Sequence, residues 1–152
     1  MSQSRLMISI VDDEAPVRKA LGRLLRASGF DVETFPSGPE FLDSLRRHLP
    51  DCTILDLHLP GLSGLEVQQR LRQENIAVPC IIITGKDEPG LGERALASGA
   101  AAFLRKPLDQ EALLAAITEA VPECGNKGAQ PQKSFNGTYS ESNGESLTNG
   151  GK

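Results

Sequence analysis

The sequence has no excess of basic residues, which argues against one broad class of ligand. Its 152 residues include 16 Lys and Arg against 20 Asp and Glu, giving a formal net charge of −4 at pH 7. Acids and bases are interleaved along the chain, so no basic face is available to neutralise a phosphate backbone. We therefore expect no direct binding to nucleic acid.

Long apolar runs and paired cysteines are missing as well. No stretch approaches the roughly 20 apolar residues that cross a bilayer, and the opening MSQSRLMISIVDDE reaches acidic residues without a signal-peptide cleavage site. Cys52, Cys80 and Cys124 form no CxxC motif, and the first two lie in apolar runs, where a reduced cysteine acts as a small hydrophobe. We expect a soluble, cytoplasmic protein with no membrane partner.

The sequence does contain an alternation of short apolar runs with segments of helical period. The runs predict strands at 5–11, 52–55, 79–84 and 101–105, and the alternation in DVETF predicts a further strand at 31–35. The segments between them predict helices at 16–28, 38–49, 64–74, 91–98 and 109–121. In the second helix Phe41, Leu42, Leu45 and Leu49 share the predicted buried face, and Asp109 supplies the N-cap oxygen of the last helix.

Nearly continuous apolar strands separated by helices are typical of a parallel sheet covered on both faces. With right-handed crossovers, this pattern predicts an α/β fold, a doubly wound five-stranded parallel sheet of flavodoxin-like order 2-1-3-4-5. We expect residues 1–122 to form this domain. Residues 123–152 are rich in Gly, Asn and Ser and poor in aliphatic residues, which predicts a flexible low-complexity tail.

Carboxylates end two of the predicted strands where the strand order reverses, the usual ligand site of such sheets. Asp12 and Asp13 follow the first strand, and Asp56 follows the third. Three crowded carboxylates raise one another's pKa values unless a cation joins them. Mg²⁺, a hard cation that takes oxygen ligands, fits this group best.

Thr84 and Lys106 follow the fourth and fifth strands at the same edge. An ammonium repels Mg²⁺, so these residues suit a bound anion. A carboxylate beside a metal, an ammonium and a hydroxyl is equipped to attack a phosphoryl group, while Lys106 and Mg²⁺ take up charge on the phosphoryl oxygens. On this interpretation Asp56 becomes an acyl phosphate. Each residue alone has an ordinary explanation, such as a solvated loop or a surface lysine, and the joint pattern is what favours the site.

Four motifs carry a family resemblance: SIVDDE, ILDLHLPGLSGLE, IIITG and AAFLRKPLD. In this order and spacing they resemble the receiver domain of bacterial two-component response regulators. FPSGPEFL together with IIITGKDEPG is most similar to FixJ-type receivers. The resemblance covers roughly residues 5–121. It implies a phosphoprotein of a phosphorelay, which takes its phosphoryl group from a sensor histidine kinase and is not an enzyme acting on other substrates.

The resemblance also implies roles for individual residues. It implies Asp56 as the phosphoacceptor, and it makes the backbone carbonyl of His58 a ligand of Mg²⁺ together with Asp12, Asp13 and Asp56.

Thr84 is implied as the switch hydroxyl, Lys106 as the residue that binds the phosphoryl group, and Phe103 as the rotating aromatic. The bond between Lys106 and Pro107 is usually cis in the family. The fourth helix and fifth strand are implied as the surface that meets a downstream protein or a second receiver.

Three alternatives stay open. A haloacid-dehalogenase-like phosphatase needs a second aspartate where this chain has Glu14, and a further acidic pair where only Asp109 appears. A flavodoxin needs hydroxyls and amides in the loop that here carries three acids. A FixJ-type DNA-binding regulator continues into a helix-turn-helix module, a pattern not found after Val121. We favour a stand-alone receiver that docks to another protein.

Overall fold

Five parallel strands form one sheet in the order β2-β1-β3-β4-β5, as the sequence predicts. The computed structural model describes residues 5–122, so the predicted tail and Cys124 lie outside the described residues. The strands are β1 (Met7–Val11), β2 (Asp31–Phe35), β3 (Cys52–Asp56), β4 (Cys80–Thr84) and β5 (Ala102–Arg105). The helices are α1 (Ala15–Ala27), α2 (Gly38–Ser44), α3 (Gly64–Gln73), α4 (Leu91–Ala97) and α5 (Gln110–Ala120).

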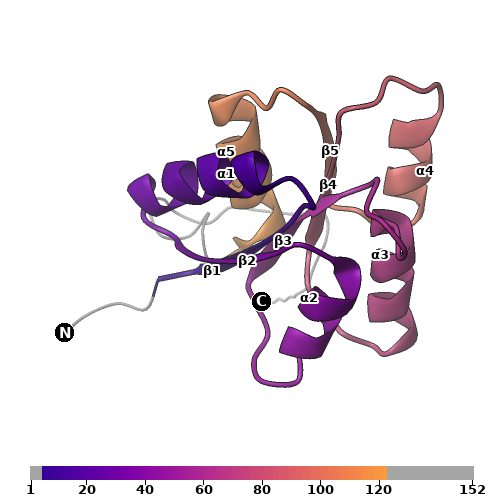
Figure 1. Ribbon diagram of the computed structural model, residues 1–152, viewed down its shortest axis with the longest axis horizontal. Helices are drawn as coiled ribbons and strands as arrows, with labels where there is room; N and C mark the ends of the chain where they lie inside the picture. The colour runs from indigo at the N-terminus through magenta and orange to yellow at the C-terminus, as the bar shows by residue number, and fades with distance from the viewer. Residues whose placement is uncertain (1–4, 123–152) are drawn as a thin grey trace, which may run out of the picture. The chain divides into compact units, whose positions relative to one another are not determined.

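Helices cover both faces of the sheet, which is why its central strands are buried and mostly apolar, while the edge strand β2 carries Asp31 and Glu33. Figure 1 shows α1 and α5 on one face and α2, α3 and α4 on the other. Every residue of β3 and β4 is buried, and the predicted burial of Cys52 and Cys80 is confirmed. Each fully buried Ile or Leu stabilises the fold by about 1.5–3 kcal/mol relative to an exposed position. None of the helices between residues 5 and 122 is both long and apolar enough to cross a membrane.

The helix ends follow local rules that the sequence carries. Pro16 lies in the first turn of α1, and the Asp109 side chain accepts a hydrogen bond from Ala112 N at 2.9 Å, so the predicted N-cap of α5 is confirmed. Ser63 and Glu66 form a reciprocal capping box at the start of α3, in which each side chain bonds the other's backbone N–H. This cap fixes the direction in which α3 leaves the end of β3.

Two side chains of α3 bind the backbone at the carboxyl end of α4. Gln68 Nε2 and Arg72 Nη1 each donate a hydrogen bond to the backbone carbonyl of Ser98, both at 2.8 Å. Ser98 directly follows the last residue of α4. Because the carbonyls at a helix carboxyl end lack partners within the helix, two donors there stabilise the end of α4.

The prediction for the end of the second helix was wrong. The apolar pattern predicts a helix as far as residue 49, whereas α2 ends at Ser44. Beyond Phe41 the backbone tightens, because Ser44 Oγ donates to the Phe41 carbonyl at 2.6 Å and Leu45 N bonds back three residues to Leu42. Leu49, predicted on the buried face, is therefore outside the helix and 54% exposed.

Candidate functional site

Polar side chains gather at one edge of the sheet because all strand pairings are parallel. Asp12 follows β1, Asp56 ends β3, Thr84 ends β4 and Lys106 follows β5. In a parallel sheet the carboxyl ends of the strands meet at the same edge. The topology thus brings together residues that are up to 94 positions apart, the difference between 106 and 12.

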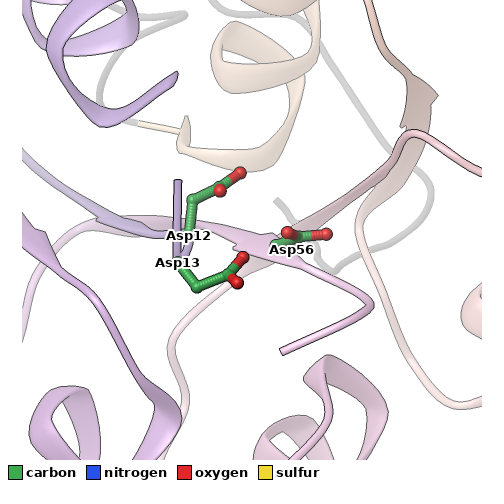
Figure 2. A group of neighbouring side chains, drawn as sticks. All are labelled: Asp12, Asp13 and Asp56. Carbon is green, nitrogen blue, oxygen red and sulfur yellow. The ribbon is translucent and has the colours of Figure 1, made fainter. Parts of the chain in front are cut away.

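Three aspartates form an acidic cluster at this edge, drawn in Figure 2. Each of Asp12, Asp13 and Asp56 offers a carboxylate oxygen, and these oxygens lie within 4.8 Å of one another. Asp12 is fully buried and Asp56 is 4% exposed, whereas Asp13 is exposed. Backbone N–H groups orient the two buried carboxylates: Glu14 N donates to Asp12 Oδ1 at 2.9 Å, and His58 N donates to Asp56 Oδ1 at 3.2 Å.

Lys106 faces this cluster from the β5 side, next to a cis peptide bond to Pro107. Its Nζ lies 2.9 Å from Asp12 Oδ2, and 3.5 Å from both Asp56 Oδ2 and Glu14 Oε1. Burial lowers the pKa of Lys106, but the contact with Asp12 and the charges of the acids outweigh this effect, so the pKa is raised overall. The ammonium is therefore held in its charged form.

Asp56 is in an environment that disfavours its charged form. Burial, and then the negative charge of Asp12, raise the pKa of Asp56 above its ordinary value. The His58 N–H and Lys106 counteract this only in part. One ammonium among three aspartates leaves the cluster negative, so a divalent cation that takes oxygen ligands fits between Asp12, Asp13 and Asp56.

Thr84 ends β4 at the edge of the site, and Phe103 lies further back on β5, in register with Ile82. Thr84 is fully buried, and its Oγ1 accepts a hydrogen bond from Lys86 N at 3.1 Å, in the loop that leads to α4. Phe103 is half-buried and packs against the hydrophobic core on the α4 side of the sheet. A Cβ at Gly92 would meet its ring at 3.2 Å, so the ring lies against the first turn of α4.

The prediction from sequence missed Gly64, which shapes the site through the backbone. A Cβ at Gly64 would lie 2.5 Å from the backbone oxygen of Asp56 and 2.9 Å from Leu57 Cα. Only a residue without a side chain lets α3 start this close to the end of β3. The signal in the sequence is a glycine directly after the N-cap Ser63, in the segment PGLSGLE. The structure also shows Glu14 beside Lys106, a contact that the sequence did not predict.

Comparison with known proteins gives one consistent result. The family model of the response regulator receiver domain matches residues 8–118. The chain is 38% identical over 121 residues to the response regulator protein TodT of Pseudomonas putida, covering 80% of this chain and 53% of TodT. It is 35% identical over 114 residues to the transcriptional regulatory protein FixJ of Bradyrhizobium diazoefficiens, covering 75% of this chain and 56% of FixJ. The chain thus spans about half the length of the curated relatives it matches.

Solved structures extend this result to the fold. The crystal structure of FixJ-N superposes with a TM-score of 0.72 at 31% identity, covering 84% of this chain and all of that one (100%). The chemotaxis protein CheY4 of Vibrio cholerae gives a TM-score of 0.71 at 26% identity, over 78% of this chain and 100% of that one. The described fold and the sequence comparison therefore agree.

Proposed function

The chain belongs to the family of response regulator receiver domains, and from this premise we propose that it is a phosphoacceptor of a two-component phosphorelay. Asp56 takes the phosphoryl group from the phosphohistidine of a sensor histidine kinase. The observation that carries the proposal is the buried Asp56 carboxylate, with Lys106 Nζ 3.5 Å from its Oδ2 and two further aspartates beside it. Membership of this family sets aside the phosphatase and flavodoxin alternatives.

The transfer step requires a nucleophile and a means to neutralise charge. An Asp56 oxygen attacks phosphorus, the new O–P bond forms, and the N–P bond to the donor histidine breaks, so that the histidine nitrogen leaves with the electron pair. Lys106 would bind a phosphoryl oxygen, a role supported by the 3.5 Å distance between its Nζ and Asp56 Oδ2. Mg²⁺, held by Asp12, Asp13, Asp56 and the backbone carbonyl of His58, would supply positive charge to the phosphoryl oxygens.

The phosphorylated state would be read through Thr84 and Phe103. The Thr84 hydroxyl accepts a hydrogen bond from Lys86 N and can turn its own O–H toward an anion on Asp56. Phe103 then fills the space that Thr84 leaves, and α4 and β5 change position. This surface would meet a downstream protein or a second receiver.

The proposed domain is residues 1–122, followed by a tail at 123–152, and the proposed location is the cytoplasm. The chain would catalyse only its own phosphorylation and dephosphorylation. A second candidate role is that of the receiver part of a FixJ-type DNA-binding regulator. The observation favouring it is that TodT and FixJ are roughly twice as long as the matched region, with 53% and 56% covered.

Intact-mass spectrometry tests the central proposal. Wild-type protein incubated with acetyl phosphate and Mg²⁺ should gain the mass of one phosphoryl group, because Asp56 attacks small phosphoryl donors as well as phosphohistidine. Asp56→Asn should gain none, and omission of Mg²⁺ should abolish the gain in wild type. An equal gain in wild type and Asp56→Asn would remove Asp56 from this role.

A further inference from the structure

Arg105, the last residue of β5, contacts two residues of the loop before α4 and one aromatic ring of its own strand. Its Nη1 lies 2.8 Å from Asp87 Oδ1 and also donates a hydrogen bond to the Lys86 carbonyl at 3.2 Å. Its guanidinium carbon lies 5.8 Å from the centroid of the Phe103 ring, within the range of a cation–π contact. The Arg105 side chain thus links the β4–α4 loop to the Phe103 ring of β5.

The β4–α4 loop, residues 85–90, is the segment through which Thr84 is connected to α4. Lys86 fixes this loop in two ways. Its N–H donates to Thr84 Oγ1 at 3.1 Å, and its carbonyl accepts from Arg105. The Asp87 side chain is 93% exposed, so its carboxylate has little to hold it apart from the guanidinium. The resting position of the loop therefore depends on Thr84 at one point and on Arg105 at another.

We propose that Arg105 is a positioning residue that holds the β4–α4 loop and Phe103 in the resting arrangement, and so sets how readily the domain switches. The inference rests on the proposed function, in which Thr84 turns toward a phosphoryl group. When the hydroxyl turns, the Lys86 N–H loses its acceptor, while Arg105 still holds the carbonyl of the same residue. Arg105 thereby opposes the movement of the loop and stabilises the resting state.

The solvent exposure of the Arg105 contacts sets how strongly they can shift the equilibrium between the resting and switched states. The Arg105 side chain is 49% exposed, and exposed ion pairs shift an equilibrium only by small factors. A cation–π contact at the surface adds a factor of similar size. Two conformations that differ by only a few kcal/mol respond measurably to such changes. We therefore expect removal of Arg105 to favour the switched state by about two- to fivefold.

The experiment is a titration with beryllofluoride, which mimics the acyl phosphate, followed by NMR of residues 85–105. Arg105→Gln should bind beryllofluoride about two- to fivefold more tightly than wild type. Its resting peaks should lie part of the way along the line from the wild-type resting spectrum to the wild-type bound spectrum. Arg46→Gln is the matched control: it removes the same charge from an exposed side chain after α2, and should behave as wild type.

Two further variants, Arg105→Lys and Asp87→Asn, distinguish an effect on the switching equilibrium from an effect on the stability of the fold. Arg105→Lys keeps a charge for Asp87 but lacks the planar fork, so it should lie between wild type and Arg105→Gln. Asp87→Asn should reproduce part of the effect, and combining it with Arg105→Gln should add less than the sum of the two. About 1 M salt should narrow the difference in beryllofluoride affinity between wild type and Arg105→Gln, because salt screens the ion pair between Arg105 and Asp87.

The results of the beryllofluoride titration separate the proposed function from the proposed role of Arg105. A wild type that does not respond to beryllofluoride overturns the proposed function. A responsive wild type whose affinity is matched by Arg105→Gln overturns only the role of Arg105. A variant with lower unfolding temperature but unchanged beryllofluoride affinity also overturns it, because Arg105 would then be a structural residue. Asp87→Asn, which changes an exposed loop side chain, decides the question if Arg105→Gln does not fold.

Discussion

At Asp56, burial and the charge of Asp12 both raise the pKa of the carboxyl group. Because the folded-state pKa lies above the ordinary aspartate pKa of 3.8, the native state binds the proton more tightly than the unfolded chain. Stability is therefore lost as pH rises from the unfolded pKa through the folded one. Without Mg²⁺, Asp56→Asn should have a higher free energy of unfolding than wild type at neutral pH, and this advantage should shrink as pH falls toward 3.8.

Urea unfolding at several pH values measures this difference. Asp43→Asn removes an exposed carboxylate next to Arg46 and Arg47 and controls for the change in net charge. Added Mg²⁺ should favour wild type over Asp56→Asn, since a ligand that binds only the native state stabilises it. A difference between wild type and Asp56→Asn that is the same at all pH values would contradict the explanation by burial.

Gly64 offers a second test of the site, through its backbone. A methyl group there would meet the Asp56 carbonyl at 2.5 Å, and that atom cannot move aside without shifting β3 or α3. We expect Gly64→Ala to lower the free energy of unfolding by about 1–3 kcal/mol, the usual cost of overpacking. Gly22→Ala is the control, because its methyl group would meet only the flexible end of Arg26 and should stabilise α1 by up to about 1 kcal/mol. Equal effects of the two substitutions on thermal or urea unfolding would contradict the steric argument.

The gathering of Asp12, Asp56 and Lys106 at one edge could be predicted from the sequence, because it depends only on which residues end the parallel strands. Their individual contacts could not. Lys106 lies closer to Asp12 than to Asp56, at 2.9 Å against 3.5 Å, and this preference depends on side-chain conformations that no spacing encodes. The roles proposed for these residues remain predictions until the phosphorylation experiment is done.

At the scale of elements, the proposed relay from Thr84 to α4 predicts separate effects on chemistry and on conformation. Thr84→Ala keeps the acidic cluster and Lys106, so it should still be phosphorylated. It lacks the hydroxyl that turns toward the phosphoryl group, and so it should lose most of the phosphorylation-dependent NMR shifts in residues 91–108. If those shifts persist at wild-type size, the hydroxyl is not the relay.

The strands were predicted within two residues because four of them are short, mostly apolar runs bounded by polar or turn residues, and the fifth, DVETF, alternates with the period of a strand. β1, for example, begins at Met7 where the apolar run begins at 5. The end of α2 was predicted less well. Leu45 and Leu49 continue the helical period of the sequence, but the hydrogen bond from Ser44 Oγ to Phe41 competes with the next helical turn. Periodicity shows which side chains share a face, and it does not show where a local bond ends a helix.

At the scale of the whole molecule, the proposed function and the exposed surface of α4 together predict association that depends on phosphorylation. Leu96 of α4 is 52% exposed, and Arg94 lies on the same short helix. This mixture of apolar and charged groups is typical of modest, reversible contacts. We expect light scattering to show a monomer at rest and a dimer with beryllofluoride. A mass that stays monomeric at high concentration would exclude the dimer and leave a different protein as the partner.

A chain ending at residue 122 tests the proposed domain boundary in the same measurement. If residues 1–122 are the complete receiver, phosphorylation and association should match those of the full chain. Loss of either in the shortened chain would assign a function to residues 123–152.

The double hydrogen bond to the Ser98 carbonyl has a mechanical consequence for α4. Gln68 and Arg72 anchor one end of the helix on α3, so that end can act as a fulcrum. The seven residues of α4 form an arm of about 10 Å, at 1.5 Å per residue. A rotation of about 10° about the anchored end would carry the first turn, beside Phe103, through about 2 Å while the far end stays in place. Any displacement delivered by the β4–α4 loop is therefore largest next to the site and smallest at Ser98.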